Sequence, residues 1–249
     1  GGGGGQPMCD SYTGNTGSGN NDVLVWADEF DVDGLPCGDN WTFELGAGGW
    51  GNNESQYYTD RAENAVVEND VLKITAMRED FSGAEFTSAR LVSKNKFEFE
   101  YGRVEVRAKL PTGGGTWPAI WMLGADIDSN PWPGAGEMDI MEHVGNDQDR
   151  ILSTLHFPGN SGGDAIGDSA VFPGVSNEFF VYSVNWTENL IQFAVDGTII
   201  FTYGNSGAVP FNKDFFFILN VAMGGDLGGE IDPNFDQSTM EIDYVRVYQ

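Results

Sequence analysis

Alternation of apolar and polar side chains is the commonest pattern along this chain, and it predicts β-strands. Apolar residues fall at every second position in the series Phe180, Tyr182, Val184 and Trp186. Such spacing places them on one face of a strand. Similar runs predict strands over residues 71–77, 97–110, 178–186, 190–203, 215–221 and 240–248. Helical periodicity is almost absent, so we expect an all-β protein.

Two local signals refine this prediction. Asp196-Gly197 separates two alternating runs, and this dipeptide favours the tight turn of a β-hairpin. Apolar residues hold odd positions up to Tyr101 but even positions from Val104 onward. A shift of one residue turns side chains to the other face of a sheet, so we expect a bulge or bend near Gly102.

The order of the predicted strands indicates the architecture. Many strands are joined by turns without any β-α-β rhythm, which favours two antiparallel sheets packed as a jelly-roll sandwich. The length of 249 residues suits a single domain, which we assign to residues 23–249. Residues 1–22 are rich in Gly, Asn and Ser and are expected to form a flexible leader. No apolar run reaches the roughly 18 residues of a membrane span.

The charge balance excludes some partners. Lys and Arg number 12 against 38 Asp and Glu, which gives a formal net charge of −26. Such a surface repels phosphate backbones, so a nucleic-acid partner is excluded, and polyanionic substrates are disfavoured. Solubility alone is a sufficient explanation of the acidity.

Only two cysteines occur, Cys9 and Cys37. One disulfide between them would tie the leader to the domain in an oxidising compartment, while two unrelated thiols are the alternative. We therefore expect a secreted protein, with anchoring at the cell surface through the leader as a variant of this localisation.

The segment GEMDIMEHV at 136–144 carries the candidate chemistry. In a regular strand Glu137 and Asp139 share one face, while Glu142 points to the other. A bulge between Asp139 and Glu142 would bring all three carboxylates to one face, where like charges raise one another's pKa. A raised pKa suits a general acid, and a retaining glycosidase needs two carboxyls about 5–5.5 Å apart. From charge alone, a solvent-facing edge strand would be the preferred interpretation.

A family resemblance changes that interpretation. GEMDIMEH resembles the bulged Glu-x-Asp-x-x-Glu signature of glycoside hydrolase family 16, in its laminarinase form. Six further blocks match in the family's order: LVWADEFD, NNESQYYT, ARLVSKNKFEFEYGRVEVRAKLP, GGGTWPAIWMLG, ILNVAMGGDLGG and MEIDYVRVYQ. The resemblance covers nearly everything after residue 22 and implies a β-jelly roll with a substrate cleft on its concave sheet.

The resemblance also implies roles for individual residues. Glu137 would be the nucleophile and Glu142 the general acid/base, with Asp139 holding the nucleophile in place. The matching substrate-binding positions are Trp117 and Trp121, which would border sugar rings, Asn53 and Arg90, which would bind hydroxyls, and His156 on the leaving-group side. No cofactor for catalysis is implied. For Trp121, Arg90 and His156 a purely structural role is the alternative.

A structural calcium ion is a further implication of the resemblance. The matching positions are Glu29, the turn at Asp70, where the family ligand is a backbone carbonyl, and Asp243. Oxygen ligands from distant strands suit this hard cation. Three departures from the family are Ala89 in place of Gly, Phe157 in place of the commoner Trp or Tyr, and the absence of Trp from the block GGDLGG. The long polar loop 158–174 has no assigned role.

Three functions are consistent with these residues. The first is an endo-acting retaining hydrolase of β-1,3-glucan (laminarin), with mixed-linkage β-1,3/1,4-glucan as an additional substrate. The second is a hydrolase of agar, porphyran or carrageenan, although sulfated chains would call for basic groups that this sequence lacks. The third is a non-catalytic β-glucan-binding protein, which would be expected to have lost the glutamates. We expect a monomer.

Overall fold

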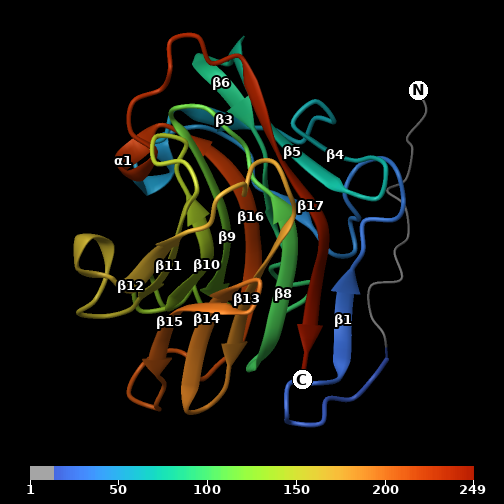
Figure 1. The fold of residues 1–249 in the computed structure, drawn as a ribbon, viewed down its shortest axis with the longest axis vertical. Helices are drawn as coiled ribbons and strands as arrows, with labels where there is room; N and C mark the ends of the chain where they lie inside the picture. Colours follow the sequence, from blue (N-terminus) through green and yellow to red (C-terminus); the bar gives the residue numbers. More distant parts are fainter. Residues whose placement is uncertain (1–13) are drawn as a thin grey trace.

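Two β-sheets packed face to face make up the protein (Figure 1). The computed structural model describes residues 14–249. In the view of Figure 1, β9 to β12 lie on the left and β8, β17 and β1 on the right. The prediction of an all-β jelly-roll sandwich is confirmed.

The first sheet has ten strands in the order β15-β14-β13-β8-β17-β5-β6-β3, with β1 paired to β17 and β4 paired to β5. Their bounds are β1 Leu24–Asp28, β3 Gln56–Tyr58, β4 Ala65–Val67, β5 Leu72–Phe81, β6 Ala84–Ser88, β8 Gly102–Lys109, β13 Phe180–Trp186, β14 Leu190–Val195, β15 Thr198–Gly204 and β17 Gln237–Tyr248.

The second sheet has seven strands in the order β12-β11-β10-β9-β16-β7-β2. Their bounds are β2 Thr42–Phe43, β7 Arg90–Val92, β9 Thr116–Gly124, β10 Glu137–His143, β11 Arg150–His156, β12 Ile166–Val171 and β16 Phe215–Met223. The short helical segments are η1 Gly49–Gly51, η2 Gly162–Asp164 and α1 Gly225–Gly228. Among the described residues no helix is long and apolar enough to cross a membrane.

The main core lies between the two sheets. The inner face of β16 contributes Phe215, Phe217 and Leu219, all of them fully buried. The ring of Trp26 stacks at 4.3 Å on that of Phe97, and aromatic contacts continue from there to Phe217. Burial of such large rings is a major source of stability and holds the seven-stranded sheet firmly against the ten-stranded one.

The expected change of register near Gly102 is confirmed, and the structure gives its cause. Phe99 pairs with Phe215 of the seven-stranded sheet, whereas β8, which starts at Gly102, belongs to the ten-stranded sheet. The chain therefore crosses between sheets here, with φ of 56° at Tyr101 and 150° at Gly102. A Cβ at Gly102 would lie 2.9 Å from the Tyr248 carbonyl oxygen, so glycine is required.

The predicted hairpin is also confirmed. Asp196 and Gly197 both have positive φ and connect β14 to β15, as expected for a tight two-residue turn. The interpretation of residues 158–174 as one loop was wrong, because η2 and the edge strand β12 lie within it. Glycine and short polar side chains hide β12 in the sequence, and backbone pairing with β11 forms it.

The predicted leader, residues 1–22, is described only from residue 14 onward. Residues 14–22 run beside the end of β17, where the Ser18 amide donates to the Gln249 carbonyl at 2.9 Å. The side-chain amide of Asn21 donates to the side-chain oxygen of Asn185 at 2.8 Å. Cys37 is buried, whereas Cys9 lies outside the described residues. The division into leader and domain, like the disulfide, stays a prediction.

Candidate active site

A β-bulge in β10 brings the three acids together. Asp139 pairs with Thr154 and Glu142 with Leu152 of β11, so three steps along β10 match two along its neighbour. The register against β9 shifts in the same interval, between Asp139 and Met141. The extra residue returns Glu142 to the face of Glu137 and Asp139. The predicted bulge is confirmed, and we call the outer side of the seven-stranded sheet that carries these acids the catalytic face.

Neighbouring strands extend this face as rows of paired residues. Glu142 lies opposite Ala119 of β9, Ala119 opposite Asn220 of β16, and Asn220 opposite Arg90 of β7. In the next row Asp139 lies opposite Trp121. Most of the predicted binding residues are therefore brought onto one face together with the acids.

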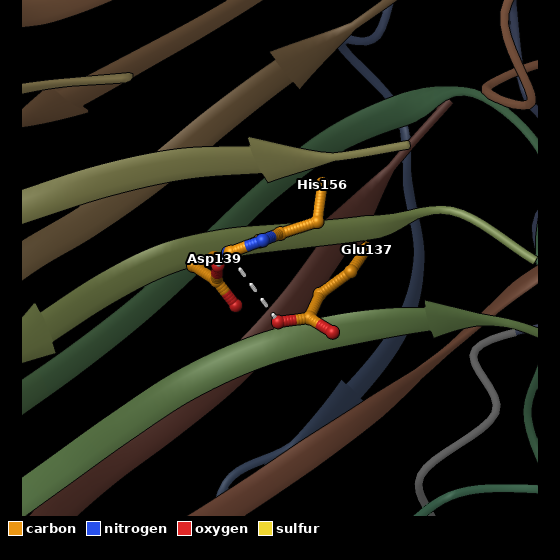
Figure 2. A group of neighbouring side chains, drawn as sticks. All are labelled: Glu137, Asp139 and His156. Atoms are coloured by element: carbon orange, nitrogen blue, oxygen red, sulfur yellow. Dashed lines mark ion pairs between the residues drawn. The ribbon is translucent and has the colours of Figure 1, made fainter. Parts of the chain in front are cut away.

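His156 of β11 lies opposite Glu137, on the other side of the acids from Arg90. Its Nε2 atom is 3.1 Å from Asp139 Oδ2 and 3.7 Å from Glu137 Oε1. Figure 2 shows the three side chains converging from β10 and β11. The imidazole thus contacts the carboxylates themselves, besides facing any substrate bound there.

Burial and mutual repulsion set the protonation of the acids. Burial, followed by the charge of Glu137, raises the pKa of Glu142 to about 7. Burial, followed by the charge of Asp139, raises the pKa of Glu137 to about 8, and burial also raises that of Asp139 well above its usual range. A carboxyl with a pKa near neutrality is suited to donate and accept a proton in turn.

Glu137 and Asp139 are joined by a side-chain hydrogen bond, which requires one proton between two carboxyl groups. The raised pKa of about 8 then belongs to the proton of the pair, and we assign that proton to Asp139, which is only 3% exposed and is the more buried of the two. Glu137 accepts a hydrogen bond from Trp132, a contact that favours its ionised form. Glu137 is therefore the better nucleophile of the two.

Two indole N–H groups donate to the glutamates. Trp117 Nε1 lies 3.1 Å from Glu142 Oε1, and Trp132 Nε1 lies 2.8 Å from Glu137 Oε2. Trp117 was predicted as a sugar-binding residue, and the structure gives its indole this polar contact as well. Trp132 was missed, although a tryptophan in the polar segment SNPWPGAG just before Glu137 could have signalled it. Its side chain is 45% exposed, which is unusual for so large a ring.

Arg90 lies between two aromatic rings. Its guanidinium carbon is 4.8 Å from the centre of the Trp50 ring and 4.9 Å from that of Trp121. Its Nε donates to Glu44 Oε2 at 2.5 Å. Cation–π contacts of this kind hold a guanidinium in place. Neither Glu44 nor Trp50 was predicted, because single residues in a Gly-rich segment carry no periodic signal.

Trp121 and Asn53 also have partners within the protein. Trp121 Nε1 donates to Asn220 Oδ1 at 2.7 Å, so its N–H is already satisfied and its ring is left for contact. Asn53 is exposed, with a φ of 57°, and its side-chain amide donates to Asp226 of α1 at 2.8 Å. Their roles in substrate binding stay predictions.

The residues proposed for calcium lie around β17, away from the acids. Glu29 follows β1 and makes two contacts of 2.8 Å with Arg246, while Asp243 lies 2.6 Å from Arg107. Among the described residues, the group of acids and histidine close enough to share an ion is Glu137, Asp139 and His156. Both carboxylates of the calcium proposal are thus paired with arginines, and backbone carbonyls such as that of Asp70 would have to complete the site.

Comparison with known proteins agrees with this geometry. The model of glycosyl hydrolases family 16 matches residues 52–246. The β-glucanase of Rhodothermus marinus is 43% identical over 91% of this chain and 85% of its own length. The glucan endo-1,3-β-glucosidase of Cryptopygus antarcticus is 39% identical over 90% and 91%. The X-ray structure of the Rhodothermus marinus laminarinase has a TM-score of 0.88 at 43% identity, covering 91% of this chain and 97% of that one. With three acids on a bulged strand and a family model spanning most of its length, this chain belongs to glycosyl hydrolase family 16.

Proposed function

We propose that this protein is an endo-acting, retaining hydrolase of the β-1,3 linkages of laminarin-type glucan. The observation that carries the proposal is the bulge of β10, which sets Glu137, Asp139 and Glu142 on one face. Each glutamate receives an indole N–H from a different tryptophan, so the two carboxyls are held separately. Two fixed carboxyls with different partners are what a double displacement needs.

The chemistry then follows from the two environments. Glu142, with a pKa near 7, protonates the glycosidic oxygen while ionised Glu137 attacks the anomeric carbon. The bond to the leaving sugar breaks and a glycosyl ester of Glu137 forms. Glu142, now ionised, takes a proton from water, and the resulting attack releases the product with its original configuration. Asp139 holds Glu137 through their shared proton during both steps.

The charges of the catalytic face favour a neutral polysaccharide. Two arginines of this face already have acidic partners, Arg90 with Glu44 and Arg150 with Asp147, and β10 adds three carboxylates. A sulfated chain would meet repulsion from these carboxylates. This favours glucan over carrageenan or porphyran. Retention of all three acids argues in the same way against a protein that only binds glucan.

Digestion of laminarin, lichenan, agarose and carrageenan side by side tests the proposal. We expect oligosaccharides of intermediate size from laminarin at early times, because an endo-enzyme cuts within chains. Proton NMR of the first product should show the β-anomer before mutarotation. Cleavage confined to agarose or carrageenan, or release of single glucose units from chain ends, would refute it. Lichenan tests whether mixed-linkage glucan is also a substrate.

A disulfide between Cys9 and Cys37 and secretion of the protein form a linked proposal. Cys37 is buried, as a bridged cysteine commonly is, and an oxidising compartment would maintain the bridge. Thiol titration of the denatured, non-reduced protein should find no reactive group. Two reactive thiols would refute the bridge. We also propose that the protein is a monomer, and light scattering of the purified chain would measure this.

Calcium at Glu29, Asp70 and Asp243 is proposed as a structural ligand only. An ion bound by the folded state alone raises the melting temperature by mass action. Chelation should therefore lower the melting temperature and leave turnover at low temperature unchanged. An unchanged melting temperature, together with metal analysis that finds no calcium, would refute the site.

A further inference from the structure

Each nitrogen atom of the His156 ring has a polar neighbour. The backbone N–H of Gly162, the first residue of η2, lies 3.1 Å from Nδ1 of His156. A backbone amide can only donate, so Nδ1 must offer its lone pair and carry no proton. In a neutral imidazole the proton then resides on Nε2.

We propose that the segment 158–164 fixes neutral His156 as the Nε2–H tautomer, and that His156 acts as a positioning residue for the Asp139–Glu137 pair. Nε2 lies 3.1 Å from Asp139 Oδ2, a buried atom that has no hydrogen-bond partner among the described residues. A hydrogen bond from Nε2 to this oxygen leaves the other oxygen of Asp139 to carry the proton shared with Glu137. The proposal rests on the proposed function for the roles of these carboxylates.

A metal ion is the competing interpretation of the same residues. Ligand atoms of Glu137, Asp139 and His156 lie within 4.8 Å of one another, close enough for one ion. A metal would need the lone pair of Nε2, because Nε2 is the nitrogen that faces the carboxylates. The Gly162 amide already occupies the lone pair of Nδ1, so the neutral ring presents a proton to the carboxylates. The structure therefore favours a hydrogen-bond donor over a metal ligand.

His143 provides a contrast within the same chain, which has two histidines. Its Nε2 accepts the N–H of Asp149 at 3.2 Å, so its proton belongs on Nδ1. Burial lowers the pKa of His143 to about 4, which keeps the ring neutral near neutral pH. The two histidines are thus expected to be opposite tautomers, each set by a backbone amide.

Nitrogen-15 NMR of the labelled full chain tests this directly, because the two rings give separate signals that His156→Gln assigns. Carboxylates of Glu137, Asp139 and Glu142 face the His156 ring, and η2 adds Asp164, so the spectra are followed up to about pH 9, well above the usual histidine pKa. We expect a protonated Nε2 on His156 and a protonated Nδ1 on His143. A proton on Nδ1 of His156 throughout this range would overturn the proposal. This measurement needs no substrate, so it stands even if laminarin is not cleaved.

Substitutions then test the role in turnover. The side-chain amide of His156→Gln reaches the position of Nε2 and retains a donor, whereas His156→Asn reaches only the position of Nδ1. We expect kcat on laminarin to stay within roughly threefold of wild type for His156→Gln and to fall about 10- to 100-fold for His156→Asn, with KM nearly constant. A mainly sugar-binding role would raise KM in both variants and would refute a positioning role.

The loop is tested separately. Gly162→Pro removes the donor to Nδ1, but it also strains the turn, because proline cannot adopt the φ of 59° at Gly162. Gly162→Ala is the control, since it strains the same φ, keeps the N–H, and places a Cβ where no atom lies within 4 Å. Gly162→Pro should lower kcat roughly 3- to 10-fold relative to Gly162→Ala and allow the other tautomer of His156, while Gly162→Ala should keep the wild-type tautomer. In the His156→Gln background the proline should have no effect beyond that of the alanine, since Nδ1 is absent. An equal loss in both backgrounds, or inhibition by micromolar Zn²⁺ that requires His156, would overturn the proposal.

Discussion

Carboxylates on the two outer faces of the sandwich have different partners. On the outer side of the ten-stranded sheet, which we call the back face, three acids have cationic partners: Glu241 with Lys109 at 3.1 Å, Asp243 with Arg107 at 2.6 Å, and Glu105 with Arg103. On the catalytic face the acids of β10 have no Lys or Arg partner among the described residues. Their contacts are two indoles and one imidazole.

The difference shows how one residue type can serve two purposes. Exposed ion pairs such as those of the back face contribute little stability. Without a cation, burial on the catalytic face raises the pKa values of Glu137 and Glu142 toward neutrality. Burial together with the lack of a cationic partner thus separates the acids of β10 from the paired acids of the back face.

The largest expected effect comes from replacing Glu137, the proposed nucleophile. Glu137→Gln should lower laminarin hydrolysis by at least about 10³-fold, because an amide of the same shape cannot form the glycosyl ester. The matched change on the back face, Glu241→Gln, should leave hydrolysis unchanged. Initial rates of reducing-sugar release measure both. Turnover by Glu137→Gln within tenfold of wild type would contradict the assignment.

The effect of replacing Glu142, the proposed acid/base, should depend on the leaving group. Glu142→Ala should lower laminarin hydrolysis about 10²- to 10⁴-fold, but it should still form the glycosyl-enzyme from an activated aryl glycoside. Azide should then react with this intermediate and yield a β-glycosyl azide, identified by proton NMR. An α-azide, or azide rescue confined to Glu137→Ala, would mean that the two roles are reversed.

Removal of the buried charge should stabilise the fold. Since the folded pKa of the Glu137–Asp139 pair lies above the unfolded value, its favourable contribution is complete below about pH 4.5 and is lost as the pH rises toward about 8. Asp139→Asn should therefore stabilise the fold more at pH 8 than at pH 5. The increase in the free energy of unfolding should be larger at pH 8 by roughly 1–2 kcal/mol, while turnover should fall. Denaturant titration at both pH values measures this. A greater gain at pH 5 would contradict the sign.

A smaller effect should follow from Trp117→Phe. The indole hydrogen bond lowers the pKa of Glu142, so its loss should raise that pKa above about 7. The acid would then stay protonated to higher pH, and the alkaline limb of kcat/KM should move up by roughly 0.5–1 pH unit. A downward movement would mean that water entering beside Glu142 outweighs the lost bond.

The smallest effect is expected on the back face. Lys109→Met breaks the pair with Glu241 and should change the free energy of unfolding by less than about 1 kcal/mol, with no change in the pH profile of turnover. Thermal denaturation at low and high salt measures it. A shift of the pH profile would show that charges of the two faces are coupled through the sandwich.

Much of the fold was predictable because alternation is strong where one side of a strand packs against the core. The segment Phe180–Trp186 and the turn at Asp196 are examples, and the bulge in β10 followed from requiring Glu142 to face Glu137. Strand β12 was not predictable, because its glycine and short polar residues show no alternating apolar pattern, and the strand forms by pairing with β11.

The site was predictable in its acids but not in their partners. The spacing of Glu137, Asp139 and Glu142 is local in sequence, so a pattern can reveal it. The contact of Trp132 with Glu137 depends on a loop that folds back, and that of Gly162 with His156 joins a backbone atom to a ring. Neither kind of contact leaves a periodic signal in the sequence.

The single extra residue in β10 also bears on how such a site can change. Side chains alternate along a strand, so a chain lacking one residue between Asp139 and Glu142 would still bring all three acids to the same face, without any bulge. What would differ is the distance and tilt of the second glutamate relative to the first. A one-codon deletion here should therefore keep the three acids on one face while changing the spacing of the two glutamates, in a strand where most insertions or deletions would destroy the pairing.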